Sequence, residues 1–132
     1  EQMDKKQLDI ALEEFFHEVQ VNSGIDIQFR KNEPTFTLTS EAELSIFRGV
    51  QEAITNAMRH GQATRITVLL MYNPSQLVVT IKDNGTGAVD LAPKGGLKSL
   101  QERLRAEGGS VTLEASNPGV TVQMILPNTE KQ

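Results

Sequence analysis

Three stretches of the chain place hydrophobic residues at the three- and four-residue spacing of an amphipathic helix. They cover residues 4–22, 41–60 and 97–107. Ser40 followed by Glu43 forms a capping box, which predicts the start of the second helix. We expect the inward stripe of that helix to consist of Leu44, Phe47, Val50, Ile54, Ala57 and Met58. In the third helix the residues expected to face inward are Leu97, Leu100 and Leu104.

Other stretches alternate hydrophobic and polar residues, the pattern of a strand with one buried face. They are residues 25–30, 64–72, 76–82, 110–115 and 120–126, with 35–38 as a short additional candidate. Turn sequences at 73–75 and 117–119 predict two antiparallel hairpins. The order of elements predicts one α/β domain over residues 1–132, an α+β two-layer sandwich. We expect a mixed, mostly antiparallel sheet with three helices on one face.

The composition of the chain excludes several kinds of functional site. The 132 residues carry a net charge of -4, which provides no broad basic field to attract nucleic acid. Cysteine is absent, so a disulfide, a cysteine-ligated zinc site and a thiol nucleophile are excluded. The chain has no apolar run near the roughly 20 residues that a membrane-spanning helix needs. It begins without Met, and we expect it to be a fragment of a longer protein.

The first candidate for chemistry is the sequence DNGTG at residues 83–87. Asp83 follows a predicted strand, which fixes its carboxylate in a position to accept a hydrogen bond from a ligand amino group. Gly85 and Gly87 let a flat or anionic ligand approach the backbone closely. The same sequence is also a common turn signal, so other features of the chain must support a ligand site.

A second polar group lies on the helix predicted for residues 41–60. At 100° per residue, Asn56 lies about 40° from Glu52, and Arg59 lies about 20° from Glu52 in the other direction. His60 lies about 80° round the helix from Glu52. These four side chains therefore project to one side of the same helix.

A third feature is the pair Gly95 and Gly96, which precedes the last predicted helix. The free N–H groups and dipole of a helix N-terminus favour a phosphate. Asn56 offers a neutral oxygen to Mg²⁺, which commonly uses one or two protein oxygens and completes its shell with phosphates and water. Together these features predict a site for a magnesium nucleoside triphosphate. Neither G-x-x-x-x-G-K-[ST] nor G-x-G-x-x-G is present, so the site is not a P-loop or a Rossmann site.

Three sequence segments resemble the motifs of the GHKL ATPases, the superfamily that includes gyrase B, histidine kinases and MutL. Their N box resembles QEAITNAMRH (51–60), and their first glycine box resembles DNGTG (83–87). The segment GGLKSLQERL (95–104) resembles the second glycine box of sensor histidine kinases of the NarL/DesK type. The resemblance covers about residue 7 to residue 127, and the order and spacing of the three segments make it specific.

The resemblance implies a Bergerat fold that binds ATP and Mg²⁺. Asp83 is then expected to accept the hydrogen bond of the adenine amino group, and Gly87 to let the base lie against the loop. Asn56 is expected to hold Mg²⁺, and Arg59 and His60 to face the phosphates.

Further roles follow from the same resemblance. Glu52 is expected to act with Asn56 in catalysis by orienting water or the metal-bound assembly. Residues 88–95 are expected to form a short ATP lid. Lys94 stands where the family often has a glycine, and its amine is a candidate phosphate contact. The remaining residues expected to bind ATP are Gly85, Gly95, Gly96 and Leu97.

The last hairpin departs from the family pattern. Relatives often have Gly-Thr there, whereas this chain has Gly119, Val120 and Thr121. We expect Thr121 to point to the other face of its strand, because successive strand residues alternate between faces.

The function implied is that of the ATP-binding catalytic domain of a two-component sensor histidine kinase. The γ-phosphoryl group would pass to a histidine on a separate dimerising helical hairpin, outside this sequence, and a response regulator would act downstream. We expect the isolated domain to be a monomer that turns over ATP slowly or not at all. The whole kinase is expected to be a homodimer, with this chain as a cytoplasmic domain of a membrane-anchored sensor. The alternatives are another GHKL protein, either an anti-sigma-type serine kinase or a clamp like gyrase B, and a nucleotide-free interaction domain.

Overall fold

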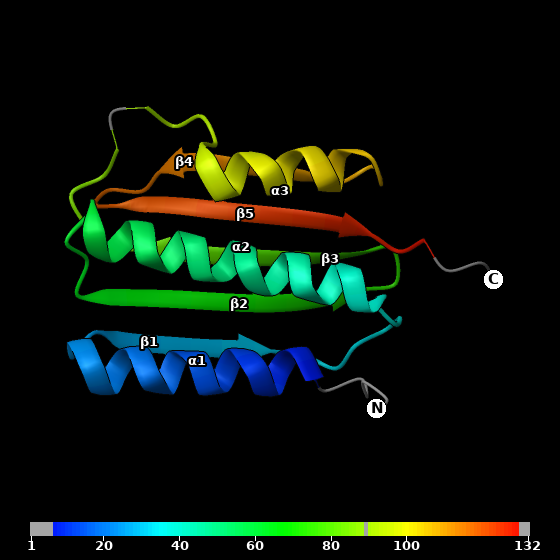
Figure 1. The fold of residues 1–132 in the computed structure, drawn as a ribbon, viewed down its shortest axis with the longest axis horizontal. Helices are drawn as coiled ribbons and strands as arrows, with labels where there is room; N and C mark the ends of the chain where they lie inside the picture. The colour runs from blue at the N-terminus through cyan, green and yellow to red at the C-terminus, as the bar shows by residue number, and fades with distance from the viewer. Residues whose placement is uncertain (1–6, 89, 130–132) are drawn as a thin grey trace.

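The computed structural model describes residues 7–88 and 90–129. Its helices are α1 (Gln7–Ser23), α2 (Ser40–Arg59) and α3 (Gly95–Arg105). Its strands are β1 (Asp26–Lys31), β2 (Arg65–Asn73), β3 (Gln76–Asp83), β4 (Ser110–Ala115) and β5 (Val120–Pro127). Figure 1 shows the sheet, whose strand order is β1-β2-β3-β5-β4. β1 is parallel to β2, and the other neighbouring pairs are antiparallel.

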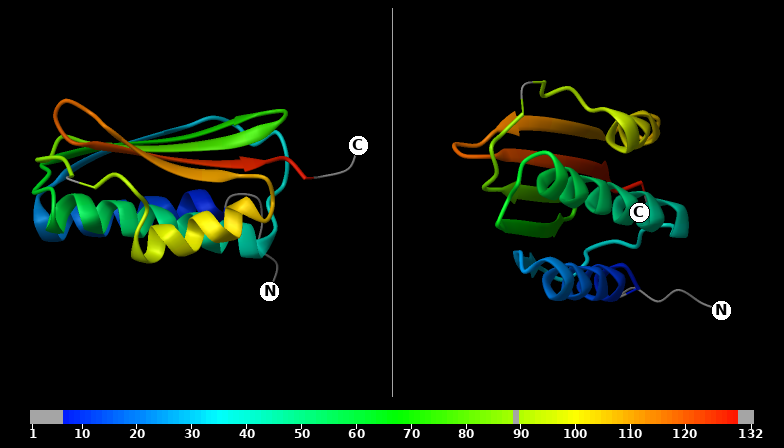
Figure 2. Two further views of the ribbon diagram at one scale, coloured as in Figure 1. Left: turned by 90° about the horizontal axis from the view of Figure 1, so that it is seen from above. Right: turned by 60° about the vertical axis from the view of Figure 1, so that its left-hand side comes forward.

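The three helices cover one face of the sheet and leave the other face open, as Figure 2 shows in the view from above. The predicted two-layer fold and its mixed sheet are therefore confirmed. The two predicted hairpins are present as β2–β3 and β4–β5. Within the described residues, none of the helices combines the length and the apolar composition that a membrane crossing requires.

The core lies between the two layers. Alternate residues of the central strands point into it, including Ile66 and Val68 of β2 and Ile81 of β3. Gly49 lets α2 pack tightly against α3 and β5, because a β-carbon there would lie 2.4 Å from Leu100 Cδ2 and 2.9 Å from Met124 Cε. Burial of this apolar surface is the main driving force for holding the helices on the sheet.

The start of α2 differs from the prediction. Its N-cap is Thr39, whose hydroxyl accepts the Ala42 N–H, so the capping box based on Ser40 was wrong by one residue. Leu44 was also wrongly assigned to the core, since it is 47% exposed. At 100° per residue, Leu44 lies about 140° from buried Ala57. The core stripe instead runs through residues such as Ile46, which the prediction omitted.

Residues 35–38 form no strand, in contrast to the short strand predicted there. The segment crosses from the sheet to the helical layer, and it is held by side chains rather than by strand pairing. The ring of Phe36 is buried and packs edge-on against Tyr72, with 5.3 Å between ring centroids. The Asn32 side chain bonds both the N–H and the carbonyl of Tyr72.

Candidate functional site: the α2, β3 and α3 ends

The end of α2 and the loop after β3 are in backbone contact. The Thr86 N–H donates to the carbonyl of Gly61, which follows α2, with 2.7 Å between the atoms. Gly85 packs on the same carbonyl, and a β-carbon there would lie 2.3 Å from the oxygen. The predicted N box and first glycine box, distant in sequence, are therefore brought to one end of the fold (Figure 1).

Asp83 is the buried acid of this region, with 9% of its surface exposed. Its Oδ1 accepts the N–H of Gly85 at 2.8 Å and the N–H of Val120 at 3.3 Å. Within the described residues no protein hydrogen bond reaches Oδ2, and no fully buried side-chain polar atom lacks a partner. Oδ2 is therefore accessible, and it can accept a hydrogen bond from a ligand.

Gly119 is a residue that the sequence analysis did not assign to the site. Its φ is +95°, and a β-carbon on it would lie 2.0 Å from the Asp83 carbonyl oxygen. The sequence analysis placed this glycine in a turn and in the hairpin that departs from the family pattern, without a contact to Asp83. Its contact with Asp83 depends on the pairing of β5 with β3, which residue types in the turn do not reveal.

The strand register shows on which face of the sheet the residues of the last hairpin lie. Thr121 pairs with Lys82, and Val122 pairs with Ile81. Thr121 therefore shares the open face with exposed Lys82, as expected, and its hydroxyl bonds the hydroxyl of Ser116. Val120, whose N–H reaches the Asp83 carboxylate, is the residue of this strand that comes next to that acid.

The polar face of α2 ends beside this region. Glu52 and Asn56 are half-buried, whereas Arg59 and His60 are exposed. The N–H of His60 donates to the carbonyl of Asn56, so His60 caps the helix. Positive charge at Arg59 is favourable there because the helix C-terminus carries partial negative charge.

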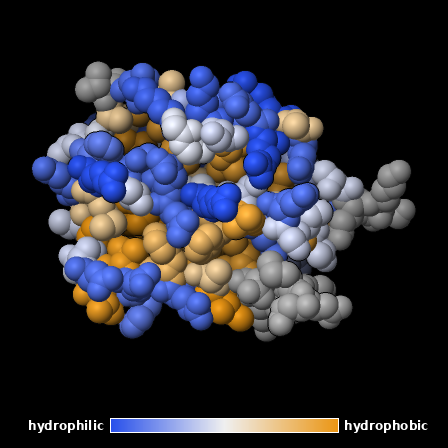
Figure 3. Space-filling view, viewed as in Figure 1, coloured by the Kyte–Doolittle hydropathy of each residue, from blue (hydrophilic) through white to orange (hydrophobic). Residues whose placement is uncertain are grey.

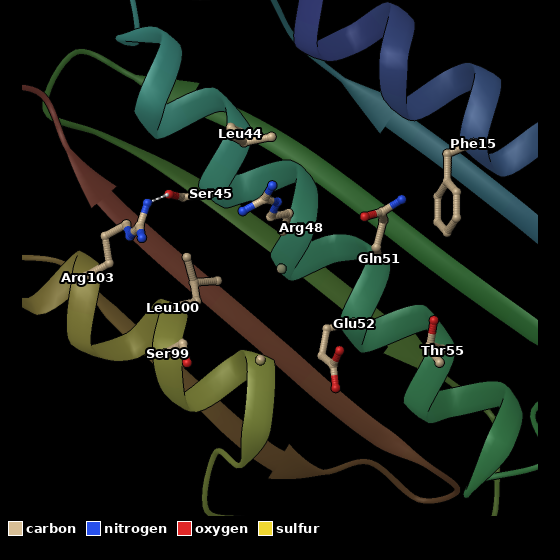
Figure 4. Close-up of a pocket in the computed structure, with 12 residues that line it drawn as sticks. Phe15, Leu44, Ser45, Arg48, Gln51, Glu52, Thr55, Ser99, Leu100 and Arg103 are labelled. Carbon is tan, nitrogen blue, oxygen red and sulfur yellow. Dashed lines mark hydrogen bonds between the residues drawn. The ribbon is translucent and has the colours of Figure 1, made fainter.

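Glu52 lies against the start of α3. A β-carbon on Gly96 would come within 3.0 Å of Glu52 Oε1, and one on Gly95 would lie 4.0 Å from Oε2. Figure 4 shows the Glu52 side chain directed from α2 toward the first turn of α3. The predicted catalytic acid and the second glycine segment are therefore neighbours.

The N-terminus of α3 has no side-chain cap. Lys94 is its N-cap residue and makes no side-chain capping bond. The Leu97 N–H donates to the Lys94 carbonyl at 3.1 Å, and the Leu97 side chain is buried in the core. Leu97 therefore has no side-chain group to offer a ligand, and its N–H already has a partner within the protein.

The predicted lid, residues 88–95, is described except for residue 89. The Lys94 amine lies 3.1 Å from Asp90 Oδ2, and both side chains are exposed. The Ala92 N–H and then Lys94 lower the pKa of the Asp90 carboxyl. In this structure the amine predicted to meet a phosphate is paired with an acid of the lid.

The side chains at this site suit a cation that takes most of its oxygen ligands from a bound phosphate compound and water rather than from the protein. Among the described residues no three His, Cys, Asp or Glu side chains are grouped to bind a metal. A neutral amide such as that of Asn56 suits Mg²⁺ that takes most of its oxygens from phosphates and water.

A groove of about 570 Å³ runs along α2 and is lined mainly by α2 and α3, with Phe15 of α1 on its other side (Figure 4). It includes Glu52 and Gly96 but neither Asn56 nor Asp83. Sequence reasoning missed this groove, because it arises from the distance between two helices. Its lining residues are Phe15, Leu44, Ser45, Arg48, Gly49, Gln51, Glu52, Thr55, Gly96, Ser99, Leu100 and Arg103.

The fold is similar to that of solved kinase domains. The catalytic domain of histidine kinase ThkA, in a nucleotide-free form, matches with a TM-score of 0.76 at 17% identity and covers 98% of this chain and 96% of that chain. The ATP-binding domain of PrrB from Mycobacterium tuberculosis matches with a TM-score of 0.66 at 22% identity, over 87% of this chain and 88% of that chain.

Curated relatives are sensor histidine kinases. The oxygen sensor histidine kinase NreB of Staphylococcus carnosus is 29% identical over 97% of this chain and 38% of its own length. The sensor histidine kinase YxjM of Bacillus subtilis is 32% identical over 89% of this chain and 29% of its own length. The chain therefore spans about a third of the length of these relatives. Residues 41–130, more than half of the chain, match a family model, and the chain belongs to that family, the histidine kinase-, DNA gyrase B- and HSP90-like ATPases.

Proposed function

We propose that the chain is the ATP-binding catalytic domain of a two-component sensor histidine kinase. In this proposal it binds Mg-ATP and transfers the γ-phosphoryl group to a histidine on a separate dimerisation helix. The domain lies on the cytoplasmic side of a membrane-anchored homodimer, and a response regulator takes the phosphoryl group afterwards.

The observation that carries the proposal is the position of Asp83. Its Oδ1 is held by two backbone N–H groups, so its accessible Oδ2 has a fixed direction. An acceptor fixed in this way suits the exocyclic amino group of adenine. The neighbouring glycines, Gly85 and Gly87, leave room for a flat base.

The triphosphate would extend from Asp83 toward α2 and α3. Asn56 would hold Mg²⁺ through its amide oxygen, and Arg59 and His60 would lie near the phosphates. The first turn of α3, behind Gly95, adds backbone N–H groups and a favourable dipole. When bound, Mg²⁺ would neutralise phosphate charge, and the protein would contribute mainly positioning.

Glu52 has a defined place in this proposal. Its carboxylate lies at the first turn of α3, where the γ-phosphate would approach the acceptor. A carboxylate there can orient a proton-bearing nucleophile toward the phosphate. It also repels a phosphate that is not neutralised by a cation, so Glu52 makes productive binding depend on Mg²⁺.

Isothermal titration of the chain with Mg-ATP tests binding, and absence of binding would reject the proposal. In a thermal shift assay, ligand at 100 times its dissociation constant is expected to stabilise the chain by about 2.7 kcal/mol. A matched control is Thr80→Ala on the open face of β3, which should bind as the unchanged chain does.

The chemical stability of the phosphorylated product distinguishes a histidine kinase from a serine kinase. Incubation with γ-labelled ATP and a candidate acceptor is expected to give label that is lost in acid and kept in alkali, as for phosphohistidine. Label with the opposite stability would indicate a serine kinase. Binding without any transfer to the natural acceptor would indicate a nucleotide-binding domain of another kind.

A further inference from the structure

The side chain of Asn84 joins the two loops at the end of the fold that carries the candidate site. Its Oδ1 accepts the N–H of Thr64 and the N–H of Arg65, each at 2.9 Å. Its Nδ2 donates to Thr64 Oγ1 at 3.0 Å. The sequence analysis gave Asn84 no role, although it lies in the first glycine segment. This one side chain binds three groups of the chain where the loop after α2 enters β2.

The loop between α2 and β2 leads from these bonds back to Asn56. The Gly61 carbonyl in this loop accepts the Thr86 N–H at 2.7 Å. The Gly61 N–H in turn donates to the carbonyl of Asn56 at 3.2 Å. A short path of hydrogen bonds therefore connects the loop after β3 to the backbone of Asn56.

Gln62 shows that the loop after α2 depends on its neighbours for its shape. Its φ is +53°, in the left-handed region that a residue with a β-carbon rarely adopts. Such a conformation persists where the surrounding structure fixes the backbone. The chain on one side of Gln62 is bonded to Thr86, and the chain on its other side is bonded to Asn84. Asn84 therefore helps to hold this loop in its strained conformation.

The bonds of Asn84 lie outside the hydrophobic core. Asn84, Gln62 and Thr64 are all exposed. Figure 3 shows mostly hydrophilic residues at the left-hand end of its view, where α2 ends. Side-chain bonds to nearby backbone groups can order such a loop without apolar packing. Removing them is therefore expected to shift the loop while the packing between helices and sheet remains.

We propose that Asn84 is a positioning residue that sets the distance between Asp83 and Asn56. This inference rests on the proposed function, in which Asp83 binds the base and Asn56 holds the metal ion of the same nucleotide. A change in their spacing should weaken binding of the whole nucleotide, because both ends no longer fit at once. The bonds that orient the Asp83 carboxylate come from Gly85 and Val120, so recognition of the base alone should survive.

Two matched Asn→Ala substitutions separate positioning from stability. Asn73 lies at the opposite end of the β2–β3 hairpin, and its Oδ1 accepts three hydrogen bonds, from the N–H and hydroxyl of Ser75 and from the N–H of Gln76. Asn84→Ala is expected to lower the affinity for Mg-ATP at least tenfold, while the affinity for adenosine stays within twofold. Asn73→Ala should leave both affinities within twofold. In calorimetric titrations, equal Mg-ATP affinities of the two variants, or an adenosine loss as large as the Mg-ATP loss, would overturn the inference.

Amide hydrogen exchange tests the same link without nucleotide. In Asn84→Ala the Thr86 N–H, which bonds the loop after α2, is expected to exchange at least tenfold faster, because local opening becomes easier. Asn73→Ala should not change this rate. Asn84→Asp keeps an oxygen that can accept the N–H groups of Thr64 and Arg65, so it should restore slow exchange.

The exchange experiment also keeps the two proposals apart. An unchanged Thr86 rate in Asn84→Ala, or a rate in Asn84→Asp as fast as in Asn84→Ala, would overturn the role of Asn84. Because this measurement uses no ligand, absence of Mg-ATP binding by the unchanged chain would reject the proposed function separately.

Discussion

A β-carbon on Gly119 would lie 2.0 Å from the carbonyl oxygen of Asp83 and 2.6 Å from its Oδ1. The turn between β4 and β5 therefore packs directly on the acid at the end of β3. The same contact brings the Val120 N–H to the Asp83 carboxylate at 3.3 Å. The orientation of the proposed adenine acceptor thus depends on a residue that follows it by 36 positions.

Replacing Gly119 with Ala is expected to destabilise the fold and abolish nucleotide binding. Strain at a positive φ alone costs about 1–3 kcal/mol, and the new methyl group would also collide with backbone. Gly24→Ala is the matched control, because Gly24 has a φ of +77° and open space around its Cα. Urea unfolding and titration with Mg-ATP measure the two effects. Equal losses of stability in both variants would contradict the proposed contact.

Asp83→Asn is expected to weaken nucleotide binding and leave the fold intact. The amide oxygen of Asn can still accept the N–H groups of Gly85 and Val120. The amide NH₂ then replaces Oδ2 and presents a donor to the donor group of adenine. We expect a loss of affinity of roughly 10-fold or more, which corresponds to about 1.4 kcal/mol. Circular dichroism checks the fold, and an unchanged dissociation constant would remove Asp83 from the adenine site.

Asn56→Asp is expected to disturb the magnesium-dependent part of binding. A carboxylate beside the phosphates adds negative charge and changes how the cation is held. The affinity for Mg-ATP should fall more than the affinity for adenosine, measured by titration of both ligands. Gln51→Glu is the control, since it adds the same charge about 140° round the same helix. Equal binding and transfer by Asn56→Asp and the unchanged chain would exclude Asn56 from the site.

Glu52 and Gly96 are expected to be coupled in stability. In Gly96→Ala the new β-carbon would come within 3.0 Å of Glu52 Oε1, and the carboxylate has to move. In a Glu52→Ala background the same change meets no carboxylate. A double-mutant cycle by urea unfolding is expected to give a coupling energy of about 0.5 kcal/mol or more. Additive effects of the two substitutions would show that the contact carries no energy.

Tyr72 is expected to make stability fall at high pH. Burial, followed by the charges of Asp9 and Glu43, raises the pKa of Tyr72 to about 12. The folded state then keeps the phenol proton that the unfolded chain loses near pH 10, so stability declines between pH 10 and pH 12. The loss is on the order of 2 kcal/mol. Measuring the free energy of unfolding of the unchanged chain and of Tyr72→Phe across this range checks the shift. The difference between the two free energies should be constant below pH 10 and change above it. A constant difference at all pH values would refute the shift.

The sequence determined the fold class and indicated the segments of the candidate site. The two-residue period of β2 and β3 indicated which residues face the core, because the side-chain period of a strand is fixed by its geometry. Leu97, Leu100 and Leu104 identified the inner face of α3, because residues three and four positions apart lie on one face of a helix. The segments around Asn56, Asp83 and Gly95 were found because all three occur together, in the order and spacing of a known family.

Only the tertiary structure decided how these segments meet. Leu44 was expected in the core, yet it is exposed, because the rotation of α2 about its axis is set by Gly49 and by packing on the sheet. The contacts of Gly119 with Asp83, and of Glu52 with Gly96, join residues far apart in the chain. Local sequence patterns specify the geometry of single elements, whereas such contacts depend on the packing of several elements at once. The groove with Arg48 and Arg103 exists for that reason, and no single segment of the sequence predicts it.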